Sequence, residues 1–164
     1  MRKEIFQAIA DRIAQKVPDI KYIDLWNEQL AELQSATAFP TPSLFVEFEQ
    51  FEYNQNANHV TQADIGIRIH VITRTILPTG SSLRNRIAEN TLQFLDLLDE
   101  VNRALASLSG EHFSTLMHTT SATNHNHAEL IESIERYVTR GLDTSAIRQT
   151  ERIRLTDMEI IDRV

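Results

Sequence analysis

The chain of 164 residues contains no cysteine and only four glycines. Without cysteine there are no disulfides, no cysteine-ligated zinc or iron–sulfur sites and no thiol nucleophile. So few glycines leave little material for phosphate-binding loops, and neither the G-x-G-x-x-G nor the G-x-x-x-x-G-K-[S/T] pattern occurs. No apolar stretch approaches the roughly 18 residues that a membrane-spanning helix needs.

Positive charge is also scarce, because 16 Lys and Arg face 23 Asp and Glu and give a formal net charge of −7. A protein that binds free duplex nucleic acid needs surplus cations to contact phosphates, so this balance disfavours that class. The N-terminus alternates charged and apolar residues and lacks the apolar core of a signal peptide. We therefore expect a protein made and used in an aqueous compartment, and a chain without cysteine suits a reducing cytoplasm.

The remaining composition is that of an ordinary globular protein, with 41% apolar and 24% charged residues. A chain of this length buries about two thirds of its unfolded surface, so it needs no disulfide or metal to hold a core. The sequence shows no internal repeat and no linker. We expect a single domain over residues 1–164.

Hydrophobic periodicity predicts two helices. Ile5, Ile9 and Ile13 recur every fourth position and predict a helix over about 2–17. A longer helix is predicted over about 82–109 by apolar residues at every third or fourth position, and Gly110 is expected to end it.

Alternating apolar and polar residues, rich in β-branched and aromatic types, predict strands in the first half. These strands cover about 20–26, 43–53 and 63–75. In the clearest one, the isoleucines and Val71 share one face, whereas Gly66, Arg68 and His70 share the other. The strands 43–53 and 63–75 are expected to form an antiparallel hairpin around the Asn-rich stretch 54–59.

The last third of the chain is less regular, and extended segments are expected over about 113–161. Residues 119–127 are polar and predict a loop. Residues 129–142 fit a helix and a strand equally well by periodicity. Ile153 to Ile161 suggests a terminal strand pair or a bent strand, so the elements as a whole predict an α+β fold.

A histidine cluster is the first candidate for chemistry. His118, His125 and His127 fall within ten residues, and a His-x-His pair on a strand would place both rings on one face, as metal ligands require. However, no H-E-x-x-H helix accompanies them, and the surrounding Asn, Thr and Ser are typical of a solvated loop. There is no G-x-S-x-G nucleophile motif either. We therefore expect no enzyme and no cofactor.

The stretch 45–53, which is rich in acidic and aromatic residues, is the candidate for protein contact. It has two interpretations: a sheet face that is partly solvated, or a subunit interface that the neighbouring Asn-rich loop extends. On the second interpretation the interface residues are Phe45, Glu47, Phe51, Tyr53, Asn56 and Asn58.

The order of these elements resembles that of the tail-terminator and tail-completion proteins of long-tailed bacteriophages. Four stretches carry the resemblance: the opening helix Arg2–Val17, the segment Phe39–Phe48 (FPTPSLFVEF), the strand around Ile67–Val71 (IRIHV) and the long helix after Ser82. In that family a strand with a polar lead-in follows the long helix. Asn124-His125-Asn126-His127 is similar to that lead-in, which favours a strand over 129–142.

The resemblance implies a structural virion protein with a mostly antiparallel sheet packed against the N-terminal helix and the long central helix. Such proteins form a ring, often hexameric, that closes the tail tube and joins it to the head or neck. The implied partners are copies of the chain itself, the tail-tube protein and neck or connector proteins, with no cofactor and no membrane. Assembly would take place in the host bacterial cytoplasm, and an acidic lumen would let the passing genome slide. The alternatives are an α+β adaptor whose sheet edge recruits a partner strand, and a small histidine-based metal-binding enzyme.

Overall fold

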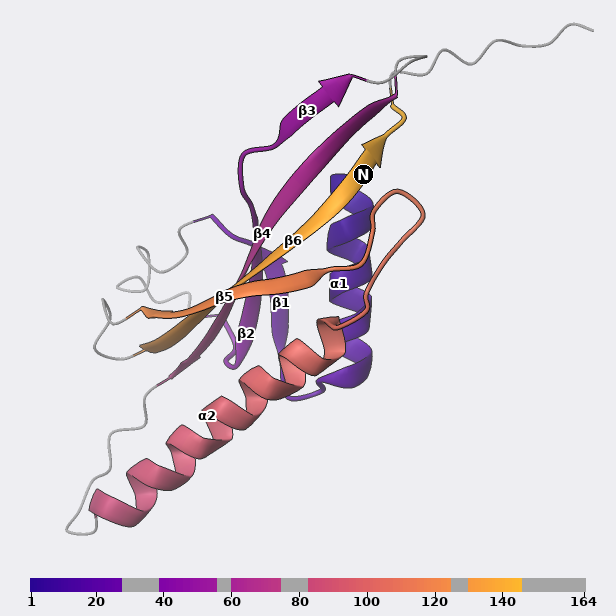
Figure 1. Cartoon of the computed structure of the whole chain (residues 1–164). Helices are drawn as coiled ribbons and strands as arrows, with labels where there is room; N and C mark the ends of the chain where they lie inside the picture. Colours follow the sequence, from indigo (N-terminus) through magenta and orange to yellow (C-terminus); the bar gives the residue numbers. More distant parts are fainter. Residues whose placement is uncertain (28–38, 56–59, 75–82, 125–129, 146–164) are drawn as a thin grey trace, which may run out of the picture.

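The computed structural model describes residues 1–27, 39–55, 60–74, 83–124 and 130–145. Over these residues two helices lie against a six-stranded sheet (Figure 1). The strand order is β1–β2–β4–β6–β5, and β3 pairs with the N-terminal part of β4. The elements are α1 (Arg2–Lys16), β1 (Tyr22–Leu25), β2 (Ser43–Phe48), β3 (Glu52–Gln55), β4 (Thr61–Arg74), α2 (Leu83–Leu105), β5 (Met117–Asn124) and β6 (Leu130–Asp143).

The sheet is mostly antiparallel. β4 pairs in this way with β2, β3 and β6, and β6 pairs with β5. Only β1 runs parallel to its neighbour β2 among the described strands. The predicted α+β fold with a mostly antiparallel sheet is therefore confirmed.

The core lies between the helices and one face of the sheet. Ile65, Ile67, Ile69 and Val71 alternate along β4 and are buried on this side. The i, i+4 isoleucines of α1 pack on them, since three or four residues complete one helical turn. Phe94, Leu97 and Val101 of α2 complete the cluster.

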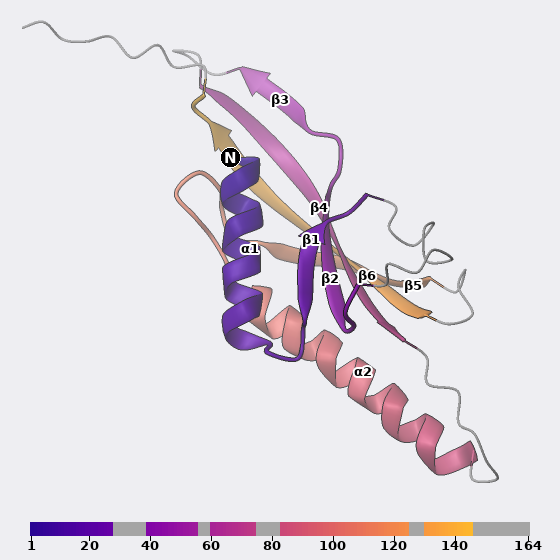
Figure 2. The same ribbon diagram turned by 180° about the vertical axis from the view of Figure 1, so that it is seen from behind.

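The long elements reach beyond this core in two directions. Figures 1 and 2 show β3 with the adjoining ends of β4 and β6 at one end of the molecule, and the N-terminal part of α2 at the other. The pairing of Glu52–Gln55 with Thr61–Asp64 forms the first of these ends. It lies beside the start of α1, as the ring of Phe51 under the guanidinium of Arg2 shows.

Three predictions about elements were wrong. The strand predicted over 43–53 is two strands, because the chain leaves the ladder after Phe48 and pairs again from Glu52. Residues 117–124, assigned largely to a loop, form the edge strand β5, whose exposed side chains need no apolar pattern. The long helix ends at Leu105 rather than at Gly110, because Ser107 adopts a left-handed conformation with φ 66°.

Other predictions are confirmed or lie outside the described residues. The helix over 2–17, the antiparallel pairing of the Leu44 and Ile69 strands, and the strand over 129–142 are confirmed. The strand that leads into the Asn-rich stretch is β3, and it pairs antiparallel with the first four residues of β4. Residues 153–161 lie outside the described part of the chain.

Candidate functional site

The sheet face opposite α1 and α2, which we call the open face, carries a network of paired charges. Its residues alternate with the core positions along each strand. The strand pairing places Arg68 of β4 opposite Glu47 on one side and opposite Arg136 of β6 on the other. Two arginines directly opposite each other repel, so this arrangement needs an anion between them.

Glu49 supplies that anion. Its backbone N–H donates to the carbonyl of Gly66 at 2.9 Å, which holds the residue over the sheet just after β2. Its carboxylate accepts hydrogen bonds from Nε and Nη2 of Arg136 at 2.9 and 2.7 Å, and it lies 2.9 Å from Nε of Arg68. The hydrogen bonds from Arg136 lower the pKa of Glu49, although partial burial acts in the opposite direction.

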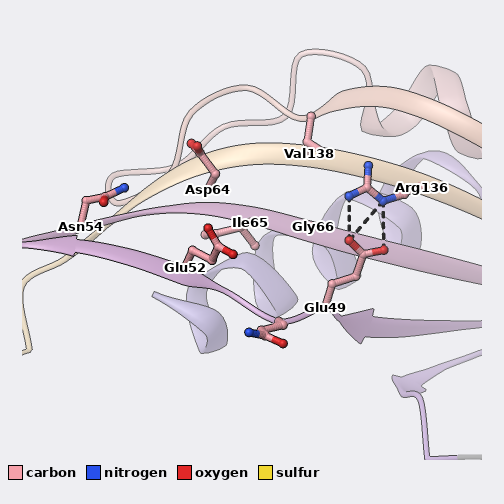
Figure 3. A pocket seen from close by; sticks show the side chains of 9 residues that line it. Glu49, Glu52, Asn54, Asp64, Ile65, Gly66, Arg136 and Val138 are labelled. Carbon is pink, nitrogen blue, oxygen red and sulfur yellow. Dashed lines mark hydrogen bonds and ion pairs between the residues drawn. The ribbon is translucent and has the colours of Figure 1, made fainter.

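Gly66 makes room for this carboxylate. A Cβ atom at position 66 would lie 2.0 Å from Oε2 of Glu49 and 3.2 Å from Nη2 of Arg136. Glycine is therefore required in the middle of β4 because another group approaches its backbone closely. Figure 3 shows Glu49 and Arg136 joined above Gly66.

His70 extends the network toward β1. Its Nδ1 lies 2.6 Å from Oε1 of the buried Glu132, and its Nε2 lies 3.1 Å from Oε2 of Glu47. When the ring carries both protons it donates to both carboxylates. The Trp26 ring stacks on the imidazole, with centroids 4.0 Å apart and planes 1° apart. Nδ2 of Asn124 donates to the second oxygen of Glu132 at 2.6 Å.

A shallow pocket of about 250 Å³ opens beside the Glu49–Arg136 pair (Figure 3). Glu52, Asn54 and Asp64 line it together with that pair. Two of its carboxylates already have cationic partners: Glu49 is paired with Arg136, and Asp64 lies 3.1 Å from Nε of Arg140. No group of three or more His, Asp or Glu side chains suited to a metal occurs within the described residues.

A second buried carboxylate, Glu135, lies on the helix side of β6. It accepts hydrogen bonds from the hydroxyls of Ser121 and Ser133 at 2.8 and 2.7 Å, and Nε2 of His118 lies 2.7 Å from its other oxygen. A nucleophilic serine needs a histidine to accept its proton. Here both serines and the histidine share one carboxylate, so their observed hydrogen bonds tie β5 to β6 rather than activate a hydroxyl.

The groups of side chains around Glu132 and around Glu135 have one chemical feature in common. Each buried carboxylate is surrounded by donors from a neighbouring strand, and such satisfied networks hold strands in one register. Burial raises the pKa of Tyr137 further along β6, with the charge of Glu135 as a second cause, so this phenol stays neutral and donates to Oδ1 of Asn102.

The four predicted interface residues that the structure describes do not form one surface. Phe45 is fully buried under Tyr22, Trp26 and Phe39 on the open face. Phe51 is only 8% exposed and belongs to the main core, so neither ring is available to a neighbouring subunit. This corrects the expectation for both, because the chain itself covers these rings.

The other predicted site residues are placed as follows. Glu47 is half-buried beside His70, and Tyr53 is exposed at the β3 end of the sheet. Asn56, Asn58, His125 and His127 lie outside the described residues. His118 pairs with Glu135, and neither ring nitrogen of His118 meets a second histidine in the described part.

Sequence reasoning missed the β6 carboxylates. Glu132 and Glu135 are both buried and belong to opposite faces of the sheet, so no amphipathic pattern marks them. One signal was present: a strand with charged residues on both faces needs partners on both sides. Their partners, His70 and His118, lie 62 and 17 residues away.

Two pairs of exposed apolar side chains lie on the elements that reach beyond the core. At the end with β3, Tyr53 and Leu142 are 46% and 43% exposed and lie in adjacent rows of the strand pairing, on opposite faces. We call this the β3 end. On α2, Leu92 and Leu95 are 58% and 50% exposed, one helical turn apart, and we call this the α2 end.

A search with protein-family models found no match to the chain, and a search of curated proteins found none either. No helix in the described residues is long and apolar enough to cross a membrane.

Proposed function

We propose that the protein is a non-enzymatic structural component of a phage virion, a tail-terminator or tail-completion protein that forms a ring where the tail joins the head or neck. The observation that supports this most directly is that two pairs of exposed apolar side chains lie on β3 with β6 and on α2, elements that reach beyond the core in opposite directions (Figure 1). Single exposed apolar residues are common, but Leu92 and Leu95 are neighbours on α2, and Tyr53 and Leu142 lie in adjacent rows on the two faces of one sheet end, so each pair is a candidate contact site.

Two different surfaces on one protomer suit a ring. When surface A of one copy binds surface B of the next, the contact is heterologous, and repetition of a rotation that closes gives a cyclic assembly. The β3 end and the α2 end differ in residues and in secondary structure, so they are candidates for A and B. The resemblance in element order adds the biological context, in which the ring closes the tail tube and the genome passes through it.

The fold also supports this role. Charged side chains on the open face are joined to one another, and the buried carboxylates are joined to donors on neighbouring strands. These contacts give a stiff protomer, which a ring of fixed diameter requires. The partners in this proposal are other copies, the tail-tube protein and neck proteins.

A complementation experiment tests the ring. One double variant, Tyr53→Ser with Leu142→Ser, removes the β3 end, and another, Leu92→Ser with Leu95→Ser, removes the α2 end. We expect light scattering to show a closed oligomer for the unaltered chain and a monomer for each variant. An equimolar mixture of the two variants keeps one intact contact, so it should give particles of twice the monomer mass.

Matched controls change exposed polar residues at the same ends: Glu52→Ser with Arg140→Ser, and Gln93→Ser with Asp96→Ser. These should assemble like the unaltered chain. A mixture that stays monomeric would contradict a heterologous contact. For the virion context, genes for portal, capsid and tail-tube proteins should flank this gene, and their absence would refute that part of the proposal.

A further inference from the structure

Among the strands that the structure describes, β5 is an edge strand with little to protect it. It is the last strand in the sheet order, and its first seven residues, Met117–Thr123, are exposed. Edge strands leave backbone N–H and C=O groups unpaired, and proteins guard them with charges, prolines or short strands. β1 and β3 have four residues each and include Asp24 and Glu52. β5 has eight residues, no proline and no charged side chain apart from the histidine that pairs with Glu135.

α2 presents one exposed apolar side chain, Leu95, on the side of the helix that reaches β6. Leu95 lies two helical turns before Asn102, and therefore on the same stripe of the helix. Asn102 accepts a hydrogen bond from Tyr137 of β6, the strand next to β5. The other flank of α2 faces α1, where Arg103 lines a cleft with Arg12. Leu95 thus lies on the stripe that reaches β6, whereas Leu92, three turns before Arg103, lies close to the stripe of that arginine.

The chain also contains a segment with the pattern of a strand. In residues 152–161, Ile153 and Leu155 alternate with arginines, whereas Met158 and Ile160 fall on the opposite face of a continuous strand. The first part of this segment therefore predicts an extended stretch with Ile153 and Leu155 on one face. It belongs to the 19 residues that follow Ser145, which can span roughly 60 Å when extended.

We propose that residues 152–161 of one copy add as an extra strand to the outer edge of β5 in the next copy, with Ile153 and Leu155 facing Leu95. Strand addition uses the free backbone groups of an edge for affinity and alternate side chains for specificity. The inference rests on the proposed ring and names the segment that joins its subunits.

The fold favours the next copy over the segment's own chain. β6 ends at the β3 end of the molecule, opposite the α2 end (Figures 1 and 2). The outer edge of β6 near that point is already paired, because Leu142 N–H donates to His112 O and Ser114 N–H donates to Arg140 O, both at 2.8 Å. Residues 112–114 thus lie between the end of β6 and the free edge of β5 in the same chain.

Cysteine cross-linking tests this directly, because the chain contains no cysteine of its own. Full-length Leu95→Cys protein is mixed with full-length Leu155→Cys protein under mild oxidation. We expect a covalent dimer of the two that forms at least tenfold faster than with the control Gln93→Cys, an exposed α2 position on another flank. A chain carrying both Leu95→Cys and Leu155→Cys should then form cross-links between copies.

Two outcomes overturn the inference: cross-links only within single doubly substituted chains, or cross-links no faster than the control. Hydrogen exchange supplies a second measurement. The amides of Met117–Thr123 should exchange at least tenfold more slowly in the oligomer, and Ile153→Ser with Leu155→Ser should remove that protection whereas Arg152→Ser with Arg154→Ser should not. Oligomers that form without β5 protection would refute this contact while leaving the ring intact. A chain that never associates would refute both.

Discussion

The close contact between Gly66 and Glu49 predicts that Gly66→Ala lowers the free energy of unfolding only while Glu49 is present. In Gly66→Ala the new Cβ would lie 2.0 Å from Oε2 of Glu49, whereas ordinary contacts begin at 3.4 Å. The oxygen must therefore retreat by about 1.4 Å, which breaks its 2.7 Å hydrogen bond with Arg136. Extra atoms in a filled site cost about 1–3 kcal/mol. We expect about 1–2 kcal/mol here, because the atom that moves ends a flexible side chain.

Without the carboxylate the same substitution should be harmless. In a Glu49→Ala background the nearest remaining atom is Nη2 of Arg136 at 3.2 Å, the end of a flexible side chain that can shift. Gly→Ala at a compatible backbone position stabilises by about 0.4–1 kcal/mol through the unfolded chain. The two substitutions should therefore be coupled by about 2 kcal/mol in a double-mutant cycle. Urea unfolding followed by the fluorescence of Trp26, the single tryptophan, measures each free energy of unfolding.

Gly141→Ala is the matched control. Its Cβ would meet Met1 Sδ at 2.4 Å and Ile65 Cδ1 at 2.6 Å, so its cost should not depend on residue 49. If Gly66→Ala costs the same with and without Glu49, the carboxylate does not occupy the space that glycine leaves, and the account of the open-face network is wrong.

Three further outcomes are expected. Ile69→Asp places a charge in the core and should cost at least about 4 kcal/mol, so circular dichroism should show no cooperative unfolding transition. Because Arg136 lowers the pKa of Glu49 from its ordinary 4.5, the ionised carboxylate stabilises the fold above about pH 4.5, and this contribution is lost as pH falls through the lowered pKa. Urea titrations below pH 4.5 should therefore show a shallower loss of stability in Glu49→Gln than in the unaltered chain, and equal slopes would contradict the pairing. Ser107→Gly removes the side chain from a left-handed backbone position and should raise the free energy of unfolding by about 0.5–1 kcal/mol, and a decrease would argue against φ 66° as a source of strain.

Much of the fold could be predicted where one face of an element is buried. Ile5, Ile9 and Ile13 recur with the period of a helix, and the isoleucines of β4 recur with the period of a strand, because each set contacts a core on one side only. β5 escaped prediction because both of its faces are exposed, so no apolar alternation marks it. Its pairing with β6 comes from backbone hydrogen bonds, which every sequence offers equally.

The candidate site was predicted less well, because its contacts join distant parts of the chain. Glu49 is the partner of Arg136, 87 residues away, and no short-range pattern joins the two. Phe45 resembled an interface residue because its aromatic ring alternates with charges. Only the stacking of Trp26 on His70, and the position of Trp26 beside Phe45, show that the chain covers this ring itself.

By itself the sequence determined the absences and the local elements: no cysteine chemistry, few glycine loops, an acidic balance, two helices and the central strands, since each follows from composition or from a short-range period. The tertiary structure alone decided which face of the sheet is open, why Gly66 must lack a side chain, and where apolar residues stay exposed at opposite ends of the molecule. The physical reason is that space-filling and charge pairing depend on residues brought together across the sheet, and a linear pattern carries no record of those distances.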